Sequence, residues 1–168
     1  MEVIMLKKIT LLGMIISATS AFGVIKVVAW DIHQVLCTKP TGLGYQCIPK
    51  EDTFALVKEL HEKGVKQVIL SNISSRSFSI LSNNYPNHFN YFDSNGSLAN
   101  AHFMFTRKPH GKYYSQFLKR NTAIAPNECI FFDDKPENIK GARAFGIDGQ
   151  IFRNAKQARI ILQRKGLL

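Results

Sequence analysis

Four short apolar runs alternate along this chain with segments of helical periodicity, and polar residues close three of the runs. The runs cover residues 24–30, 65–70, 129–132 and 147–152, and their length and β-branched content predict buried strands. Periodic apolar positions predict helices at 52–61, 74–83, 110–119, 136–145 and 155–164. Strands that alternate with helices form a parallel sheet covered on both faces. The sequence therefore predicts an α/β fold, with only the aromatic-rich segment 89–105 left ambiguous.

Length and charge limit the classes of protein that this chain can represent. Its 168 residues suffice for one domain with a sizeable core, and an apolar content of 45% excludes a disordered chain. The formal net charge of +10 favours anionic partners such as phosphorylated substrates, nucleic acid or anionic lipid. A basic surface that serves only solubility is the alternative. No RNA- or DNA-binding motif supports nucleic acid directly.

The first 23 residues differ from the rest. A basic pair, a short apolar stretch and a run of small residues predict a secretory signal peptide at 1–23, or else an N-terminal anchor or an extra helix. The apolar stretch is too short for a stable membrane span. A cleaved leader would send the remaining core, 24–168, to the periplasm or the outside. An uncleaved one would leave the protein membrane-anchored or cytoplasmic.

The chain has three cysteines, and their spacing suggests no zinc site. In an exported protein Cys37 and Cys47 could join across a loop, which would leave Cys129 alone and buried beside its strand.

Polar side chains follow three of the predicted strands. Asp31 closes the first run, Ser71 and Asn72 close the second, and Asp133 and Asp134 close the third. Ligands of parallel sheets bind beyond the carboxyl ends of the strands, so these residues should converge at one edge. Adjacent carboxylates cost free energy unless a cation or a hydrogen-bond network holds them. The pattern predicts a site for a hard metal ion.

These residues resemble the haloacid dehalogenase (HAD) superfamily, over about residues 24–153. The motif Asp-x-Asp-x-Thr/Val reads here as 31–35, a serine closing the next strand is Ser71, and a lysine before a helix is Lys108, followed by proline. The Asp-Asp pair of the family is 133–134, followed by Asn138 and a Gly-Ala helix. The resemblance implies a Rossmann-like parallel sheet with helices on both faces.

The resemblance also implies a Mg²⁺-dependent phosphohydrolase. In this interpretation Asp31 is the nucleophile that forms an aspartyl-phosphate. Metal ligands would come from the carboxylates of Asp31, Asp133 and Asp134 and from the backbone carbonyl of His33. The substrate phosphate would be bound by Ser71, Lys108 and the backbone amide of Asn72.

Position 33 departs from the family pattern, because relatives that are phosphatases carry an aspartate there as general acid and base. Imidazole has an unperturbed pKa of about 6.5 and can perform both tasks. We therefore expect His33 to be catalytic, with altered or slow turnover. The alternative is a weak or inactive HAD-like protein that binds a phosphate-bearing ligand or a partner.

The spacing between the first two motifs is short. Residues 31 to 71 leave room for a loop and one helix, so we expect no large cap domain and an open site. Open sites suit macromolecular or bulky phosphorylated substrates, although small molecules remain candidates.

Overall fold

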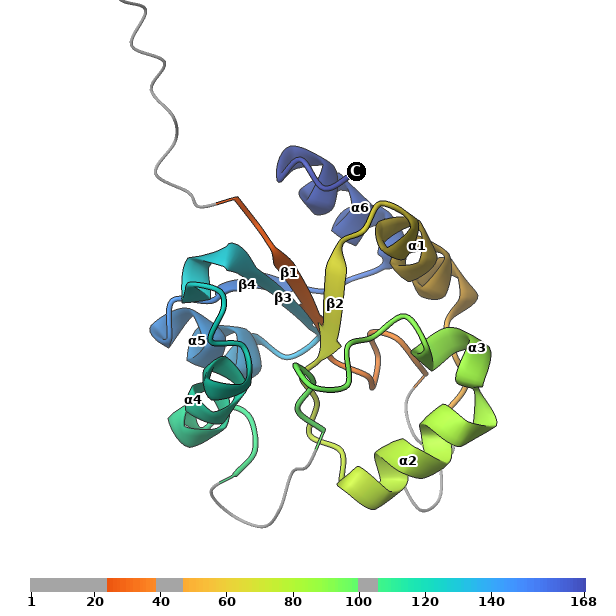
Figure 1. Ribbon diagram of the computed structural model, residues 1–168, viewed down its shortest axis with the longest axis horizontal. Helices are drawn as coiled ribbons and strands as arrows, with labels where there is room; N and C mark the ends of the chain where they lie inside the picture. The colour runs from red at the N-terminus through yellow and green to blue at the C-terminus, as the bar shows by residue number, and fades with distance from the viewer. Residues whose placement is uncertain (1–23, 39–46, 100–105) are drawn as a thin grey trace, which may run out of the picture.

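A computed structural model describes residues 24–38, 47–99 and 106–168, and the predicted leader at 1–23 lies outside these ranges. Four parallel strands form one sheet in the order β2-β1-β3-β4 (Figure 1). The strands are β1 (Val27–Trp30), β2 (Lys66–Ile69), β3 (Cys129–Asp133) and β4 (Asp148–Ile151). This arrangement confirms the predicted α/β fold with a parallel sheet.

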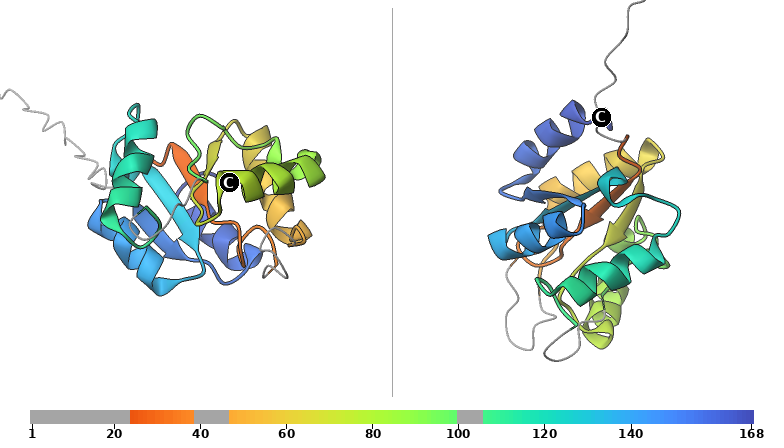
Figure 2. Two further views of the ribbon diagram at one scale, coloured as in Figure 1. Left: turned by 90° about the horizontal axis from the view of Figure 1, so that it is seen from below. Right: turned by 90° about the vertical axis from the view of Figure 1, so that its left-hand side faces the viewer.

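Helices cover both faces of the sheet (Figures 1 and 2). The apolar core on one face receives side chains from α1 (Glu51–Glu62), α2 (Ser75–Asn84), α3 (Pro86–Phe89) and α6 (Ala155–Arg164). The core on the other face is built with α4 (Gly111–Arg120) and α5 (Pro136–Ala144). Side chains alternate along a strand, so Val28 and Trp30 enter the first core while Val27 and Ala29 enter the second.

The five predicted helices are present, and their ends differ from the predicted ones by at most one residue. Two glycines in the left-handed conformation follow helices: Gly64 follows α1 and Gly146 follows α5, with φ of 75° and 80°. Glycine has no Cβ and adopts this conformation without steric cost, which makes it a common helix stop.

The segment that the sequence left ambiguous contains no added strand in its described part. Leu98 forms an isolated parallel bridge with Leu70 beyond the end of β2. Two short helical turns, α3 and the 3₁₀ helix η1 (Pro126–Glu128), were not predicted. Each begins at a proline, whose fixed φ favours the first helical position, but four and three residues are too few to show apolar periodicity.

Between β1 and β2 the described residues form α1 and a small antiparallel pairing, and no large cap domain is present. In that pairing the amide of Thr38 donates to the carbonyl of Ile48 at 2.9 Å, and the amide of Lys50 donates to Leu36 at 2.8 Å. We call the paired segments 36–38 and 47–50 the hairpin base.

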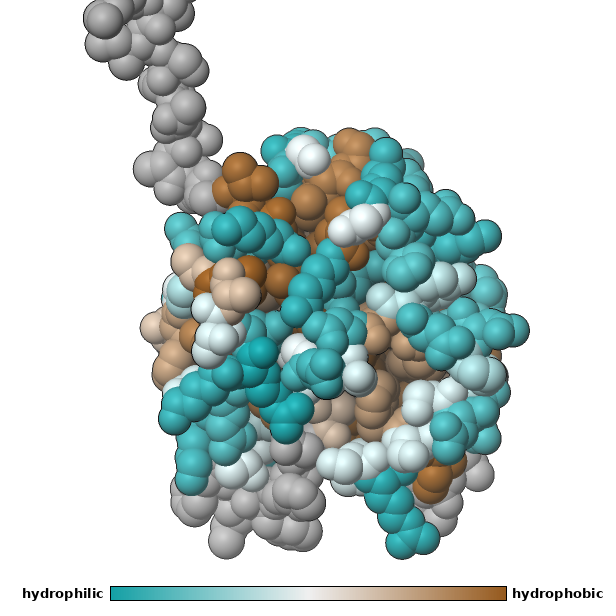
Figure 3. Space-filling view, viewed as in Figure 1, coloured by the Kyte–Doolittle hydropathy of each residue, from teal (hydrophilic) through white to brown (hydrophobic). Residues whose placement is uncertain are grey.

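Hydrophilic side chains dominate the face seen in Figure 3, with apolar surface visible between them. Across the described ranges, no helix combines the length and the apolar character that crossing a bilayer requires.

Candidate active site

Three carboxylates meet at the carboxyl edge of the sheet, as the strand ends predicted. Asp31 follows β1, Asp133 ends β3 and Asp134 follows it, and one oxygen of each lies within 4.8 Å of the others. Asp31 and Asp133 are buried, whereas Asp134 is partly exposed. Carboxylate oxygens are the donors that Mg²⁺ prefers, so this set fits a hard divalent cation.

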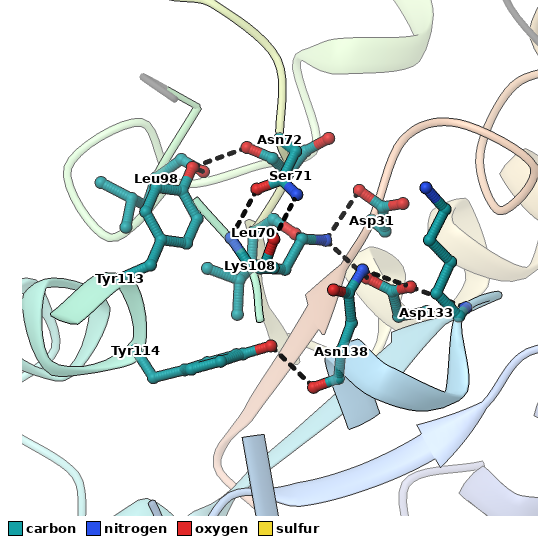
Figure 4. A network of polar contacts seen from close by, with 11 residues as sticks. Asp31, Leu70, Ser71, Asn72, Leu98, Lys108, Tyr113, Tyr114, Asp133 and Asn138 are labelled. Atoms are coloured by element: carbon teal, nitrogen blue, oxygen red, sulfur yellow. Dashed lines mark hydrogen bonds and ion pairs between the residues drawn. The ribbon is translucent and has the colours of Figure 1, made fainter. Parts of the chain in front are cut away.

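Lys108 lies between two of these carboxylates (Figure 4). Its side chain is fully buried, and its Nζ lies 2.9 Å from Asp31 Oδ1 and 2.5 Å from Asp133 Oδ2. It also donates to the carbonyl of Leu70 at 2.7 Å. An ammonium has three donors, so these contacts use all of them. In this arrangement Lys108 acts first as an anchor for the two aspartates, and contact with a phosphate would replace one of its present acceptors.

Asp133 is held by further hydrogen bonds. Its Oδ1 accepts from the amide of Lys135 at 2.9 Å, and the side-chain amide of Asn138 lies 3.0 Å from both oxygens. Burial raises the pKa of Asp133 against the opposing effect of Lys108. Burial also raises the pKa of Asp134, and the charges of Asp133 and Asp31 add to the effect. A cation at this edge would relieve both costs.

Ser71 is buried with its backbone satisfied and its hydroxyl unsatisfied. Its carbonyl accepts from the Tyr113 hydroxyl at 2.6 Å, and its amide donates to Leu98 at 3.1 Å. Within the described residues, Ser71 Oγ has no hydrogen-bond partner. A buried hydroxyl without a partner is costly, so this orphaned group favours a bound polar ligand.

The side chain of Asn72 forms two hydrogen bonds with the backbone of Lys108 (Figure 4). Its Oδ1 accepts from the Lys108 amide at 2.7 Å, and its Nδ2 donates to the Lys108 carbonyl at 2.9 Å. The sequence predicted that Asn72 binds phosphate through its backbone amide, and that remains a prediction. The structure adds a second function, which is to position the lysine.

His33 is partly buried and its side chain turns to the hairpin base. It interacts with the side chain of Cys47, which in turn interacts with Cys37. The neighbouring Cys37 thiol, with a smaller contribution from His33, holds the pKa of the Cys47 thiol below its ordinary value, and the Cys47 thiol together with burial raises the pKa of Cys37. Both cysteines are free thiols, so the disulfide that the sequence allowed is absent from the structure.

Two tyrosines of α4 support the site, and the sequence did not predict this role. Tyr113 binds the Ser71 carbonyl, and Tyr114 donates to the carbonyl of Asn138 at 2.6 Å. Periodicity placed both on the inward face of α4, but it cannot show which hydroxyl reaches a distant backbone group. Asn138, which follows the Asp-Asp pair in the family motif, braces the Asp133 carboxylate through its side-chain amide.

Comparison with known proteins places these motifs in context. The family profile of haloacid dehalogenase-like hydrolases matches residues 41–146, a range that contains Ser71, Lys108 and both acids of the 133–134 pair. The chain is similar to flavin mononucleotide hydrolase 1 of Arabidopsis thaliana, a chloroplast protein, with 31% identity over 98 residues. That match covers 53% of this chain and 39% of the relative, so the chain spans well under half of that protein.

Solved structures share the fold. A HAD-superfamily hydrolase from Ehrlichia chaffeensis has a TM-score of 0.65 at 16% identity and covers 84% of this chain and 97% of its own. The phosphatase-containing N-terminal part of protein BF1531 from Bacteroides fragilis, solved with Mg, has a TM-score of 0.59 at 13% identity and covers 77% of this chain and 36% of its own. At these identities the likeness concerns the fold alone.

Proposed function

The chain belongs to the haloacid dehalogenase-like hydrolases, and we propose that it is a Mg²⁺-dependent phosphohydrolase with Asp31 as nucleophile. The observation that carries this proposal is the buried Lys108, which joins Asp31 to Asp133 at the edge where Ser71 presents its orphaned hydroxyl. The similar flavin mononucleotide hydrolase and the Mg-bound phosphatase domain of the same fold add support.

The proposed reaction has two displacements at phosphorus. Because Lys108 holds Oδ1, attack is assigned to Oδ2 of Asp31. The new bond to phosphorus forms as the ester oxygen leaves, and that oxygen takes a proton from His33. Water then attacks the aspartyl-phosphate, gives its proton back to His33 and releases inorganic phosphate. Ser71 Oγ and the amide of Asn72 hydrogen-bond phosphoryl oxygens through both steps.

The residues that would hold Mg²⁺ are Asp31, Asp133, Asp134 and the backbone carbonyl of His33. When bound, the ion supplies positive charge that offsets the repulsion between the nucleophile and an anionic phosphate. Asn138 and the Lys135 amide keep the Asp133 carboxylate oriented toward this edge. Lys108 holds Asp31 next to Asp133, so these two carboxylates are already positioned for the metal ion in the ligand-free protein.

One observation favours the alternative of a HAD-like protein without turnover. The His33 ring interacts with the Cys47 thiol at the hairpin base, and that interaction competes with the transfer of a proton to or from a substrate. A protein that only binds a phosphate-bearing ligand or a partner would need Ser71 and Lys108 but no proton transfer at residue 33.

The substrate proposed is a phosphomonoester, either a small molecule or a group on a macromolecule. The absence of a large cap among the described residues suits bulky substrates, and the formal charge of +10 suits anionic ones. Nucleic acid has no motif to support it. Export of a core cleaved near residue 23 remains part of the proposal, with an anchored or cytoplasmic protein as the alternative.

The test is phosphate release by the full chain from a panel of phosphoesters that includes flavin mononucleotide. We expect Mg²⁺-dependent release between about pH 5 and pH 9 and its loss in Asp31→Asn. Asn fits the same space, so folding should be retained and can be checked by circular dichroism. If the parent releases nothing from any substrate while His33→Asp gains activity, the alternative is correct.

A further inference from the structure

Two buried thiols lie side by side at the hairpin base. Cys37 is the antiparallel partner of Pro49, and Cys47 precedes that proline by two residues. Side chains two apart on an extended strand point to the same face, so Cys37 and Cys47 project toward one side of the pairing. Both are buried in the same apolar core, and each thiol influences the pKa of the other.

The third cysteine is separate from this pair. Cys129 begins β3 and lies in the core on the opposite face of the sheet, where its Sγ is 3.8 Å from the carbonyl of Ile130. A bond between Cys129 and either partner would have to pass through the sheet. The fold therefore allows one intramolecular disulfide.

The thiol pair is joined to the proposed acid-base residue. Residues 33 and 37 form a parallel bridge, and the His33 ring interacts with the Cys47 thiol and helps to lower its pKa. A chain of contacts thus runs from Cys37 through Cys47 to His33, on the loop that follows the nucleophile. A chemical change at the thiols has a direct route to the site.

We propose that Cys37 and Cys47 are a redox-modification site that forms a reversible disulfide, and that its formation removes the thiol partner of His33. The first part stands on the hairpin geometry alone, and the effect on turnover rests on the proposed function. The oxidant is a small-molecule disulfide, such as oxidised glutathione.

The exchange proceeds in two steps. Sulfur of Cys47 bonds to one sulfur of oxidised glutathione, the glutathione disulfide breaks, and the released sulfur takes the thiol proton. Sulfur of Cys37 then bonds to Cys47, and the second glutathione leaves with the second proton. The protein loses two electrons and two protons, and one oxidised glutathione becomes two reduced molecules.

Access to the thiols requires local opening. Cys37 is 0% and Cys47 2% exposed, and the backbone bonds of Thr38 and Lys50 close the hairpin base over them. Neighbouring Ile48 is 65% exposed, so the outer strand of this pairing has little packing on its solvent side. Segments that are exposed on one side open locally at lower free energy than parts of the core that are enclosed on all sides. Oxidation should therefore be slow and should not need global unfolding.

The test is incubation of the native full chain in glutathione buffers of stepped ratio, followed by alkylation and peptide mapping. We expect a 37–47 linkage with Cys129 alkylated, no linkage in Cys37→Ser or Cys47→Ser, and an unchanged linkage in Cys129→Ser. No linkage at any ratio in the folded protein, linkage only in urea, or pairing through Cys129 would overturn the proposal.

The coupling to His33 has a readout that does not depend on turnover. The NMR signals of the His33 ring nitrogens, which the His33→Gln variant identifies by their absence, should shift on oxidation and return when reductant is added. The Cys129→Ser variant should show the same shift as the parent. Unmoved signals in a protein that carries the bridge would refute the coupling. Where phosphate release is measurable, its rate should change by about fivefold, the worth of one hydrogen bond. Absent phosphate release alone would count against the proposed function and leave the disulfide result intact.

Discussion

At the scale of single residues, the site depends on side chains that position other side chains. Lys108 orients two aspartates, and Asn72 fixes the backbone of Lys108 through a donor and an acceptor. Asn138 is held in turn by Tyr114 and reaches both oxygens of Asp133. The carboxylates that would meet a substrate are therefore held by the charged Lys108 and by neutral groups that position Lys108 and Asp133.

Removing the Asn72 side chain tests this positioning role. Asn72→Ala loses both bonds to Lys108 but keeps its own backbone amide, so kcat should fall by about tenfold or more while KM changes little. The thermal midpoint should also fall, by the equivalent of about 1–3 kcal/mol. Asn83→Ala, at an exposed position of α2, is the matched control. A raised KM with unchanged kcat would instead mean that the Asn72 side chain binds phosphate.

A second residue-scale prediction concerns Asp93, which anchors the loop after α3. It pairs with Lys66 at 2.7 Å and accepts from the Asn95 amide at 2.9 Å, and the Lys66 bond holds its pKa below the ordinary 3.8. A lowered carboxyl pKa stabilises the fold above the unfolded value and loses that contribution as pH falls through the folded value.

Asp93→Asn should therefore lower the free energy of unfolding at pH 7 by about 0.5–1.5 kcal/mol, and the difference should shrink as the pH falls below about 3.8. Urea titrations at pH 7 and below about pH 3.8 measure this difference in the free energy of unfolding. Glu62→Gln breaks a looser pair with Lys58, at 3.7 Å between exposed groups, and should have a smaller effect. Equal losses for Asp93→Asn at both pH values would show that the charge is not responsible.

At the scale of elements, the contact between α4 and α5 positions the site. Gly141 of α5 lies where an added Cβ would be 2.8 Å from the carbonyl of Pro109 and 2.8 Å from the Tyr114 ring. The same contact carries the Tyr114–Asn138 bond and lies beside Lys108. Close approach of the two helices thus depends on a residue without a side chain.

Gly141→Ala should force these elements apart. The clash should cost about 1–3 kcal/mol, more than the gain of up to about 1 kcal/mol in helix propensity, so the thermal midpoint should fall. Phosphate release should fall with it, because Asn138 and Lys108 move. Lys140→Ala, at the exposed neighbouring position of α5, should leave both unchanged. A stabilised Gly141→Ala protein would mean that the packing relaxes without strain.

At the scale of the whole molecule, the carboxylates of the site destabilise the fold in the absence of a bound cation. The pKa values of Asp133 and Asp134 are raised, so the folded protein binds these protons more tightly than the unfolded chain. The metal-free protein should accordingly lose stability as pH rises from the ordinary carboxyl value through the raised ones. Mg²⁺ should reverse this loss.

Thermal melts with and without MgCl₂ at about pH 5 and pH 8 check the direction of this pH dependence and its reversal by Mg²⁺. At a concentration about 100-fold above its Kd, Mg²⁺ should add about 2–3 kcal/mol, with the larger gain at the higher pH, where protons do not compete. NaCl at matched ionic strength should add far less, and Asp31→Asn should weaken the response. A gain that is larger at acid pH would contradict the assignment of these carboxylates as ligands.

The sequence by itself determined the parallel sheet, the five long helices and the convergence of Asp31, Ser71 and Asp133 at one edge. These follow from local rules, because periodicity reports burial and the ends of parallel strands share an edge. Only the tertiary structure decided that Asn72 holds Lys108, that Tyr114 supports Asn138 and that His33 turns to Cys47. These are contacts between residues distant in sequence or across a loop, and their geometry depends on how whole elements pack rather than on any local pattern.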